Sequence, residues 1–212
     1  MRPIGIVNHI MQGYRATMDA WARSPHNDGR GAHFGVNRAG EAAQYASIYT
    51  VAWHASRRDA RPPTWPLYRV GVDPGSVTVG VEHEGFSVDP GYGHDYLYDA
   101  THPWPADMVA ATARVQRWVC DETGIAPGPT TIIGHRALNP ISRADDPGSA
   151  WPQDQIIAGA GGTIMSPPLS WLQRRVLQSL NFPVRMGGLG GKITATPLPM
   201  EGGLPTYKIR VG

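Results

Sequence analysis

The sequence predicts an α/β domain in which a mixed central β-sheet is flanked by helices, followed by a Gly/Pro-rich C-terminal extension. Short β-branched segments, such as residues 4–10 and 76–86, are typical of buried strands. Residues 105–123 carry an apolar stripe at helical spacing. The predicted order of strand, helix, hairpin, strand, helix, strand and helix is typical of an α/β domain.

The first half of the predicted domain begins with a strand at residues 4–10 and a short helix at residues 16–23. The segments GAHFGV and EAAQYAS flank a turn signal at residues 37–40, which predicts a hairpin. The clearest strand is SVTVGVEHEGF, because its residues alternate in character. Its predicted faces are Val77, Val79 and Val81 on one side and Thr78, Gly80, Glu82 and Glu84 on the other.

The second half of the domain contains the longest predicted helix, at residues 105–123, which starts near a proline and stops at Gly124. Its apolar stripe consists of Met108, Thr112, Val115 and Val119. A short strand at residues 130–135 and a helix at residues 151–159 are expected to follow.

We place the end of this domain near residue 160, because residues 159–162 read GAGG and have the composition of a joint. The domain is therefore predicted to be residues 1–160. Residues 161–212 are predicted to form a helix at residues 167–180 and a Gly/Pro-rich tail with two short strand-like pieces. This extension is expected to be a linker, a docking segment or part of another module.

Composition excludes several classes of protein. The chain has 212 residues with a formal net charge of +2 and no long basic run, so there is no case for nucleic-acid binding. The single cysteine, Cys120, excludes an internal disulfide framework. The N-terminal residues lack the apolar segment of a signal peptide, and no segment is long enough for membrane insertion. Synthesis as a soluble cytoplasmic protein is expected.

Three residues form a candidate Zn²⁺ site. His9 and His135 each lie at the end of a short β-branched segment, and Asp146 precedes a Pro–Gly turn. Two imidazoles and a carboxylate leave a fourth position for water, which is typical of a hydrolytic zinc site. Either histidine alone is more simply a buried structural residue. Asp145 is a rival ligand, and we prefer Asp146 because the following turn would orient it.

Two charged residues are candidates for catalysis. Glu82 lies on the polar face of its strand beside Gly80, whose missing side chain leaves room for a substrate, so Glu82 could transfer protons there. The simpler interpretation is an exposed strand residue, and Glu84 could serve equally well. Arg143 could stabilise an oxyanion, although loop arginines are usually only solvated.

The remaining histidines divide into two groups. His54 and His33 are candidates to contact substrate, with a structural role as the equal alternative. The others are expected to be surface or loop residues, namely His26, His83, His94 and His102.

These motifs, taken together, resemble the zinc-dependent N-acetylmuramoyl-L-alanine amidases, a family that includes phage endolysins, muropeptide amidases and peptidoglycan recognition proteins. The resemblance covers about three quarters of the chain. It rests on five motifs in order: VNH with His9, GAHFGVNRAGEAAQY at residues 31–45, VAWHAS at 51–56, VGVEHEG at 79–85 and GHR…DPG at 134–148.

The resemblance implies a zinc at the floor of a groove, with His9, His135 and Asp146 as ligands. It also implies Glu82 as the acid/base group and His54 as a residue of the substrate groove. The sequence departs from the family pattern where many members carry a tyrosine before His33 and a lysine two residues before the zinc carboxylate. Ala32 and Ala144 occupy those two positions.

The resulting hypothesis is hydrolysis of the amide that joins N-acetylmuramic acid to L-alanine in peptidoglycan, by a phage lysin made in the host cytoplasm that acts on the bacterial wall. One alternative is a non-catalytic peptidoglycan-binding module. Another is a structural component of a virion tail tip that attaches to virion proteins through residues 161–212.

Overall fold

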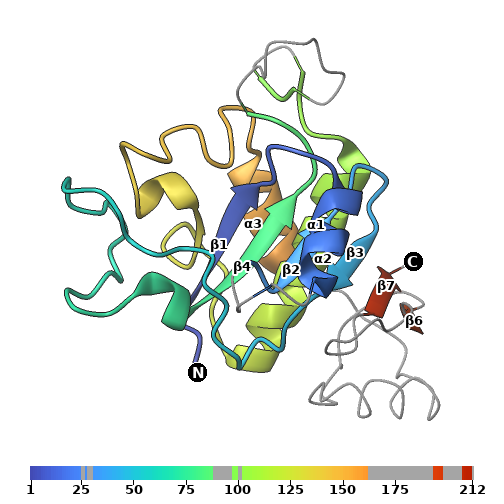
Figure 1. Ribbon diagram of the computed structural model, residues 1–212, viewed down its shortest axis with the longest axis horizontal. Helices are drawn as coiled ribbons and strands as arrows, with labels where there is room; N and C mark the ends of the chain where they lie inside the picture. The colour runs from blue at the N-terminus through green and yellow to red at the C-terminus, as the bar shows by residue number, and fades with distance from the viewer. Residues whose placement is uncertain are drawn as a thin grey trace.

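The structure is a computed structural model, shown in Figure 1, that describes most of the first 161 residues. The described residues are 1–24, 27, 31–87, 97–99 and 102–161, together with two strands at 193–197 and 207–211. The predicted helix at residues 167–180 lies outside the described residues, as do His26 and His94.

A mixed β-sheet forms the centre of the fold, as predicted. Its strand order is β5-β1-β4-β2-β3, extended by β7 and β6. β1 pairs in parallel with β4 and β5, and β2 pairs in parallel with β4, whereas the β2–β3, β3–β7 and β6–β7 pairs are antiparallel. The strands are β1 Gly5–Ile10, β2 Phe34–Val36, β3 Ala42–Gln44, β4 Thr78–His83, β5 Ile132–Gly134, β6 Ile193–Pro197 and β7 Tyr207–Val211. The predicted hairpin is therefore confirmed as β2 and β3.

Among the described residues, three α-helices cover the sheet, with α2 and α3 behind it and α1 in front in the view of Figure 1. They are α1 Arg15–Arg23, α2 Ala106–Thr123 and α3 Gln153–Gly161, and two short 3₁₀ helices lie at η1 Pro74–Ser76 and η2 His135–Ala137. All four residues of the predicted apolar stripe are buried on α2. Within the described residues, no helix combines the length and apolar character needed to cross a bilayer.

The strand register sorts the side chains between the two faces of the sheet. His9 pairs with Glu82, and Val7 pairs with both Gly80 and Ile133, so these five residues share one face. The alternate residues face α2 and α3 and build the larger apolar core, which includes Ile6, Ile10, Val79, Val81, Met108, Val119 and Ile156. His9 and Glu82 thereby lie on the face of the sheet opposite α2 and α3.

The expectation of a joint at GAGG is wrong for its first three residues, because Gly159–Gly161 belong to α3. A Cβ on Gly159 would lie 2.7 Å from the Cβ of Ala113, closer than two carbon atoms can pack. Gly159 therefore permits the close approach of α3 to α2. Neither the 1–160 boundary nor the role of residues 161–212 is tested by the structure, and both stay predictions.

Replacing Gly159 with alanine should destabilise the protein by about 1–3 kcal/mol, because overlap with Ala113 outweighs the gain in helix propensity. The measurement is urea unfolding followed by circular dichroism. Gly161→Ala is the matched control, since a Cβ there meets nothing within 4 Å and stability should hold or rise. Equal effects of the two substitutions would contradict this account of the α2–α3 contact.

Candidate metal centre

Three side chains that are distant in sequence meet at one edge of the sheet. His9 lies near the end of β1, and His135 begins η2 directly after β5. Because β1 and β5 are neighbouring parallel strands, their ends lie side by side. The Nδ1 atoms of His9 and His135 are 3.0 Å apart, and Asp146 Oδ2 lies 3.5 Å and 3.0 Å from them respectively. The sequence grouping of these residues is thus matched by their position in space.

Asp146 is held in place by the strand next to it. Its Oδ1 accepts a hydrogen bond from the Ile10 N–H at 2.9 Å, which leaves Oδ2 toward the two histidines. Pro147 packs where Gly134 has no side chain, because a Cβ on Gly134 would lie 2.6 Å from Pro147 Cδ. Asp145 is exposed to solvent. The geometry therefore favours Asp146 over its rival.

Burial and mutual contacts shift the pKa values of the three residues. Burial lowers the pKa of His135 to about 4. Burial also acts to lower the pKa of His9, but the hydrogen bond and charge of Asp146 outweigh it and the pKa is raised. Although burial alone would raise the pKa of Asp146, the hydrogen bonds from the two histidines hold it below its usual range. Asp146 is thus the carboxylate that acts on the pKa of both imidazoles.

The donor set fits Zn²⁺. Two imidazole nitrogens and one carboxylate oxygen are the usual ligands of a catalytic zinc with an open position. Atoms bound at about 2.0–2.2 Å to one tetrahedral centre lie roughly 3.4 Å apart, and the three separations here are 3.0, 3.0 and 3.5 Å. A divalent cation would also place positive charge between these three atoms and displace any proton that they share.

Glu82 lies beside this group, on the residue of β4 that pairs with His9. The residue is partly exposed, yet its Oε2 is inaccessible to solvent and has no hydrogen-bond partner among the described residues. Burial raises the pKa of Glu82 to about 7, with the charge of His9 acting against it. The interpretation of Glu82 as a solvated strand residue is therefore wrong.

Glu84, the alternative to Glu82 for proton transfer, has a structural role. Its two carboxylate oxygens accept the backbone N–H groups of Arg15 and Arg38, each at 3.0 Å. Both oxygens are thus engaged in holding the start of α1 and the turn after β2. This arrangement leaves Glu82 as the carboxylate available for proton transfer.

Gly80 leaves room for a protein side chain, and the expectation that this space admits substrate is wrong. A Cβ on Gly80 would lie 2.5 Å from Cγ of His54, so the imidazole occupies that space. Burial lowers the pKa of His54 well below its usual value. The predicted contact of His54 with substrate stays a prediction.

His33 is fully buried, and both of its ring nitrogens are engaged. Its Nδ1 accepts the Gly80 N–H at 2.9 Å, and its Nε2 lies 3.0 Å from the carbonyl oxygen of Thr50. The expected contact with substrate stays a prediction, and complete burial weighs against it.

Arg143 is exposed on the loop that joins His135 to Asp146. Its positive charge lies close enough to lower the pKa of both Glu82 and His9. The predicted oxyanion role stays a prediction that this proximity supports.

Sequence reasoning missed Asn139. This buried residue places its Nδ2 3.0 Å from His135 Nε2 and accepts the Arg58 N–H at 2.8 Å through Oδ1. It therefore ties a candidate ligand to the loop that carries His54. Its position four residues after His135 was the only signal in the sequence.

His83 was expected at the surface and is instead fully buried on the helix-covered face of β4. Its Nδ1–H donates to the His9 carbonyl oxygen at 2.7 Å, and its ring packs on Trp104. The strand alternation that places Val79 and Val81 in the core extends to His83 and would have predicted its burial.

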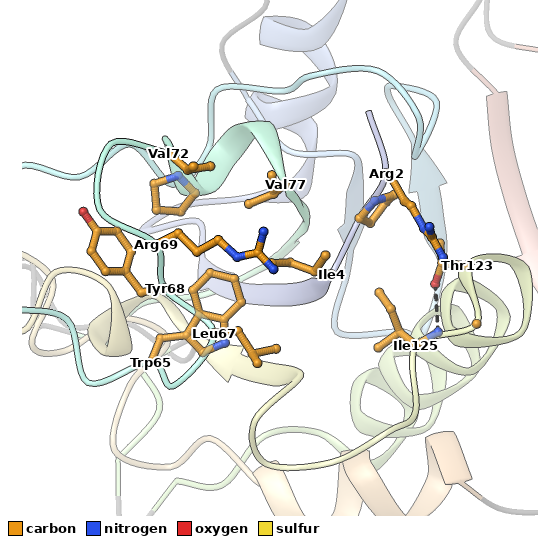
Figure 2. Close-up of a pocket in the computed structure, with 13 residues that line it drawn as sticks. Arg2, Ile4, Trp65, Leu67, Tyr68, Arg69, Val72, Val77, Thr123 and Ile125 are labelled. Atoms are coloured by element: carbon orange, nitrogen blue, oxygen red, sulfur yellow. Dashed lines mark hydrogen bonds between the residues drawn. The ribbon is translucent and has the colours of Figure 1, made fainter.

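A cavity of about 510 Å³ lies at the other end of the parallel strands. Its lining includes Ile4 and Val77, which precede β1 and β4, whereas His9 and Glu82 lie near the ends of those strands. Figure 2 shows the Arg69 side chain extending toward Ile4 across this cavity. None of the predicted site residues lines it, so it is separate from the metal centre.

Comparisons with known proteins show the family of the chain. Residues 1–149 match the family described as N-acetylmuramoyl-L-alanine amidase. N-acetylmuramoyl-L-alanine amidase A of Achromobacter lyticus is 24% identical over 177 residues, covering 74% of this chain and 84% of the relative.

Solved structures share the fold at low identity. The amidase AmiD from E. coli, in complex with the substrate anhydro-N-acetylmuramic acid-L-Ala-D-γ-Glu-L-Lys, has a TM-score of 0.58 at 17% identity, covering 88% of this chain and 74% of AmiD. The amidase LysC from Clostridium intestinale has a TM-score of 0.51 at 16% identity, covering 74% of this chain and 85% of LysC.

Acidification should destabilise the fold through His83, because burial lowers its pKa from 6.5 to about 3. Its neutral form is favoured in the folded state, so this stability is complete above about pH 6.5 and is lost as the pH falls toward 3. The loss is at most about 1.4 kcal/mol per pH unit.

The measurement is the unfolding free energy of the wild type and of His83→Gln between pH 7 and pH 4. The advantage of the wild type over the variant should shrink as the pH falls. A constant difference across this range would show that His83 does not titrate on unfolding.

Proposed function

We infer that this chain, which belongs to the N-acetylmuramoyl-L-alanine amidase family, holds zinc with His9, His135 and Asp146 and moves protons with Glu82. As a member of that family it is an amidase of peptidoglycan, and the bond cleaved joins N-acetylmuramic acid to L-alanine. The observation that carries the inference is one cluster: three atoms that could bind a metal lie within 4.8 Å of one another, beside a carboxylate oxygen of Glu82 with no hydrogen-bond partner in the described part of the chain.

Zinc at this site would lower the pKa of a bound water to about 7 and polarise the scissile carbonyl. Glu82 accepts a proton from the attacking water and returns it to the alanine nitrogen as the C–N bond breaks. The products are the lactyl carboxylate of the sugar and the free amine of the peptide. A pKa near 7 suits a group that must both accept and donate a proton near neutral pH.

Arg143 is proposed to stabilise the negative charge that develops on the carbonyl oxygen. Its position on the loop between two of the candidate ligands, and the effect of its charge on Glu82 and His9, support this role. Because it is exposed, its contribution should be smaller than that of Glu82.

We further propose that the natural substrate is the polymeric wall and that the chain is a phage lysin. The resemblance of its motifs to a family that includes phage endolysins supports this proposal. Residues 161–212, which follow the residues matched by the family, would attach the enzyme to the wall or to virion proteins.

The direct test is mass spectrometry of purified walls and of soluble muropeptides digested by the protein with and without a chelator. We expect new L-alanine amino termini from both substrates, a fall in the turbidity of the walls, loss of cleavage with chelator and recovery with added zinc. Binding without cleavage would support the binding-module alternative. Cleavage of soluble muropeptides alone would contradict the lysin proposal.

Replacing Glu82 with glutamine should lower kcat by about 10²–10⁴-fold while zinc stays bound, because the amide cannot accept the proton. Kinetics on a soluble muropeptide and metal content measured by mass spectrometry give the two readouts. Glu84→Gln is the matched control two residues along the same strand, and it should keep kcat per folded molecule. Near-normal activity of Glu82→Gln would refute the assigned role.

A further inference from the structure

The His9 imidazole is engaged on both sides. Its Nδ1 faces His135 and Asp146 within the candidate metal group, and its Nε2 lies 2.9 Å from Nδ1 of His54. A neutral imidazole has one N–H donor and one acceptor nitrogen. Which nitrogen of His9 carries the hydrogen therefore decides whether Nδ1 has a lone pair for a metal ion.

A backbone carbonyl settles the direction of these hydrogen bonds. Nε2 of His54 lies 3.1 Å from the carbonyl oxygen of Thr78, and a carbonyl oxygen only accepts. Nε2 of His54 must carry the hydrogen, so its Nδ1 is the acceptor. Neutral His9, the form that binds a metal ion, then donates from Nε2, and the lone pair of its Nδ1 points to the group with His135 and Asp146.

His54 is itself held firmly against β4. Its ring fills the space above Gly80, where a Cβ would lie within 2.5–2.8 Å of three of its atoms. The same Gly80 donates its N–H to His33, whose ring packs edge-on against His54 with centroids 5.6 Å apart. Backbone and packing therefore fix the orientation of His54 before any ligand binds.

We propose that His54 is a positioning residue that sets the tautomer and orientation of His9 for metal binding, through the chain from the Thr78 carbonyl to His54 and then to His9. This inference rests on the proposed zinc function. It assigns His54 a part different from the predicted contact with substrate. Partners of this kind orient metal-ligating histidines, and their loss typically weakens metal affinity by about 10–100-fold.

The test measures zinc affinity by competition with a chromophoric chelator and the visible spectrum of the cobalt-substituted protein. His54→Leu removes the acceptor and should weaken zinc binding by about 10–100-fold and change the cobalt spectrum. His54→Asn keeps an oxygen near the place of Nδ1 and should stay close to the wild type. His102→Leu, the loss of an exposed histidine elsewhere, should change neither readout.

The outcomes separate this proposal from the zinc function itself. Failure of the wild type to bind zinc would overturn both. Tight zinc binding by the wild type and equally tight binding by His54→Leu, with the same cobalt spectrum, would overturn the role of His54 alone.

A second measurement does not depend on the folding of a variant. Long-range ¹H–¹⁵N spectra of the zinc-loaded wild type report which ring nitrogen of each histidine carries hydrogen. We expect hydrogen on Nε2 of both His9 and His54. Hydrogen on Nδ1 of His54 would reverse the direction of the hydrogen bond between His54 and His9 and overturn the proposal.

Discussion

Two imidazole nitrogens and a carboxylate oxygen lie 3.0–3.5 Å from one another at the edge of a sheet, and this clustering of electron-rich atoms is the constraint on which the site depends. Such atoms repel one another unless a proton or a cation lies between them. The parallel pairing of β1 and β5 brings the two histidines together, and the Ile10 N–H holds Asp146 against them. A cation bound between these three atoms would offset that repulsion.

Around these three atoms, two glycine residues determine which neighbouring side chains can approach the sheet. Gly134 admits Pro147, which follows the candidate ligand Asp146, and Gly80 admits His54, which contacts His9. In both cases a glycine on a buried strand lets a loop approach the sheet closely. The loops thus carry Asp146 and His54, whereas the strands carry His9 and Glu82 and let the loops approach them closely.

Much of the fold and part of the site could be predicted from the sequence. Alternation in β4 and the stripe on α2 predicted the right elements and faces, because apolar residues that face a core recur about every two residues in a strand and every three or four in a helix. The grouping of His9, His135 and Asp146 was predicted from their residue types and their order along the chain, and the structure brings the three side chains together.

The remaining features depend on contacts between distant segments, which no local pattern encodes. The space above Gly80 is filled by a side chain from 26 positions earlier, at His54, so a glycine expected to admit substrate admits protein instead. Gly159 had the composition of a joint, and only its contact with Ala113 shows that it belongs to a helix interface. The engagement of Glu84 by two backbone amides likewise follows from tertiary structure.

The central claim is that His9, His135 and Asp146 hold one zinc ion. A crystal of the zinc-loaded protein, measured above and below the zinc absorption edge, tests it most directly. We expect a single strong anomalous peak within bonding distance of Nδ1 of both histidines and of Oδ2 of Asp146. A peak bound through other side chains, or no peak between these three, would contradict the account.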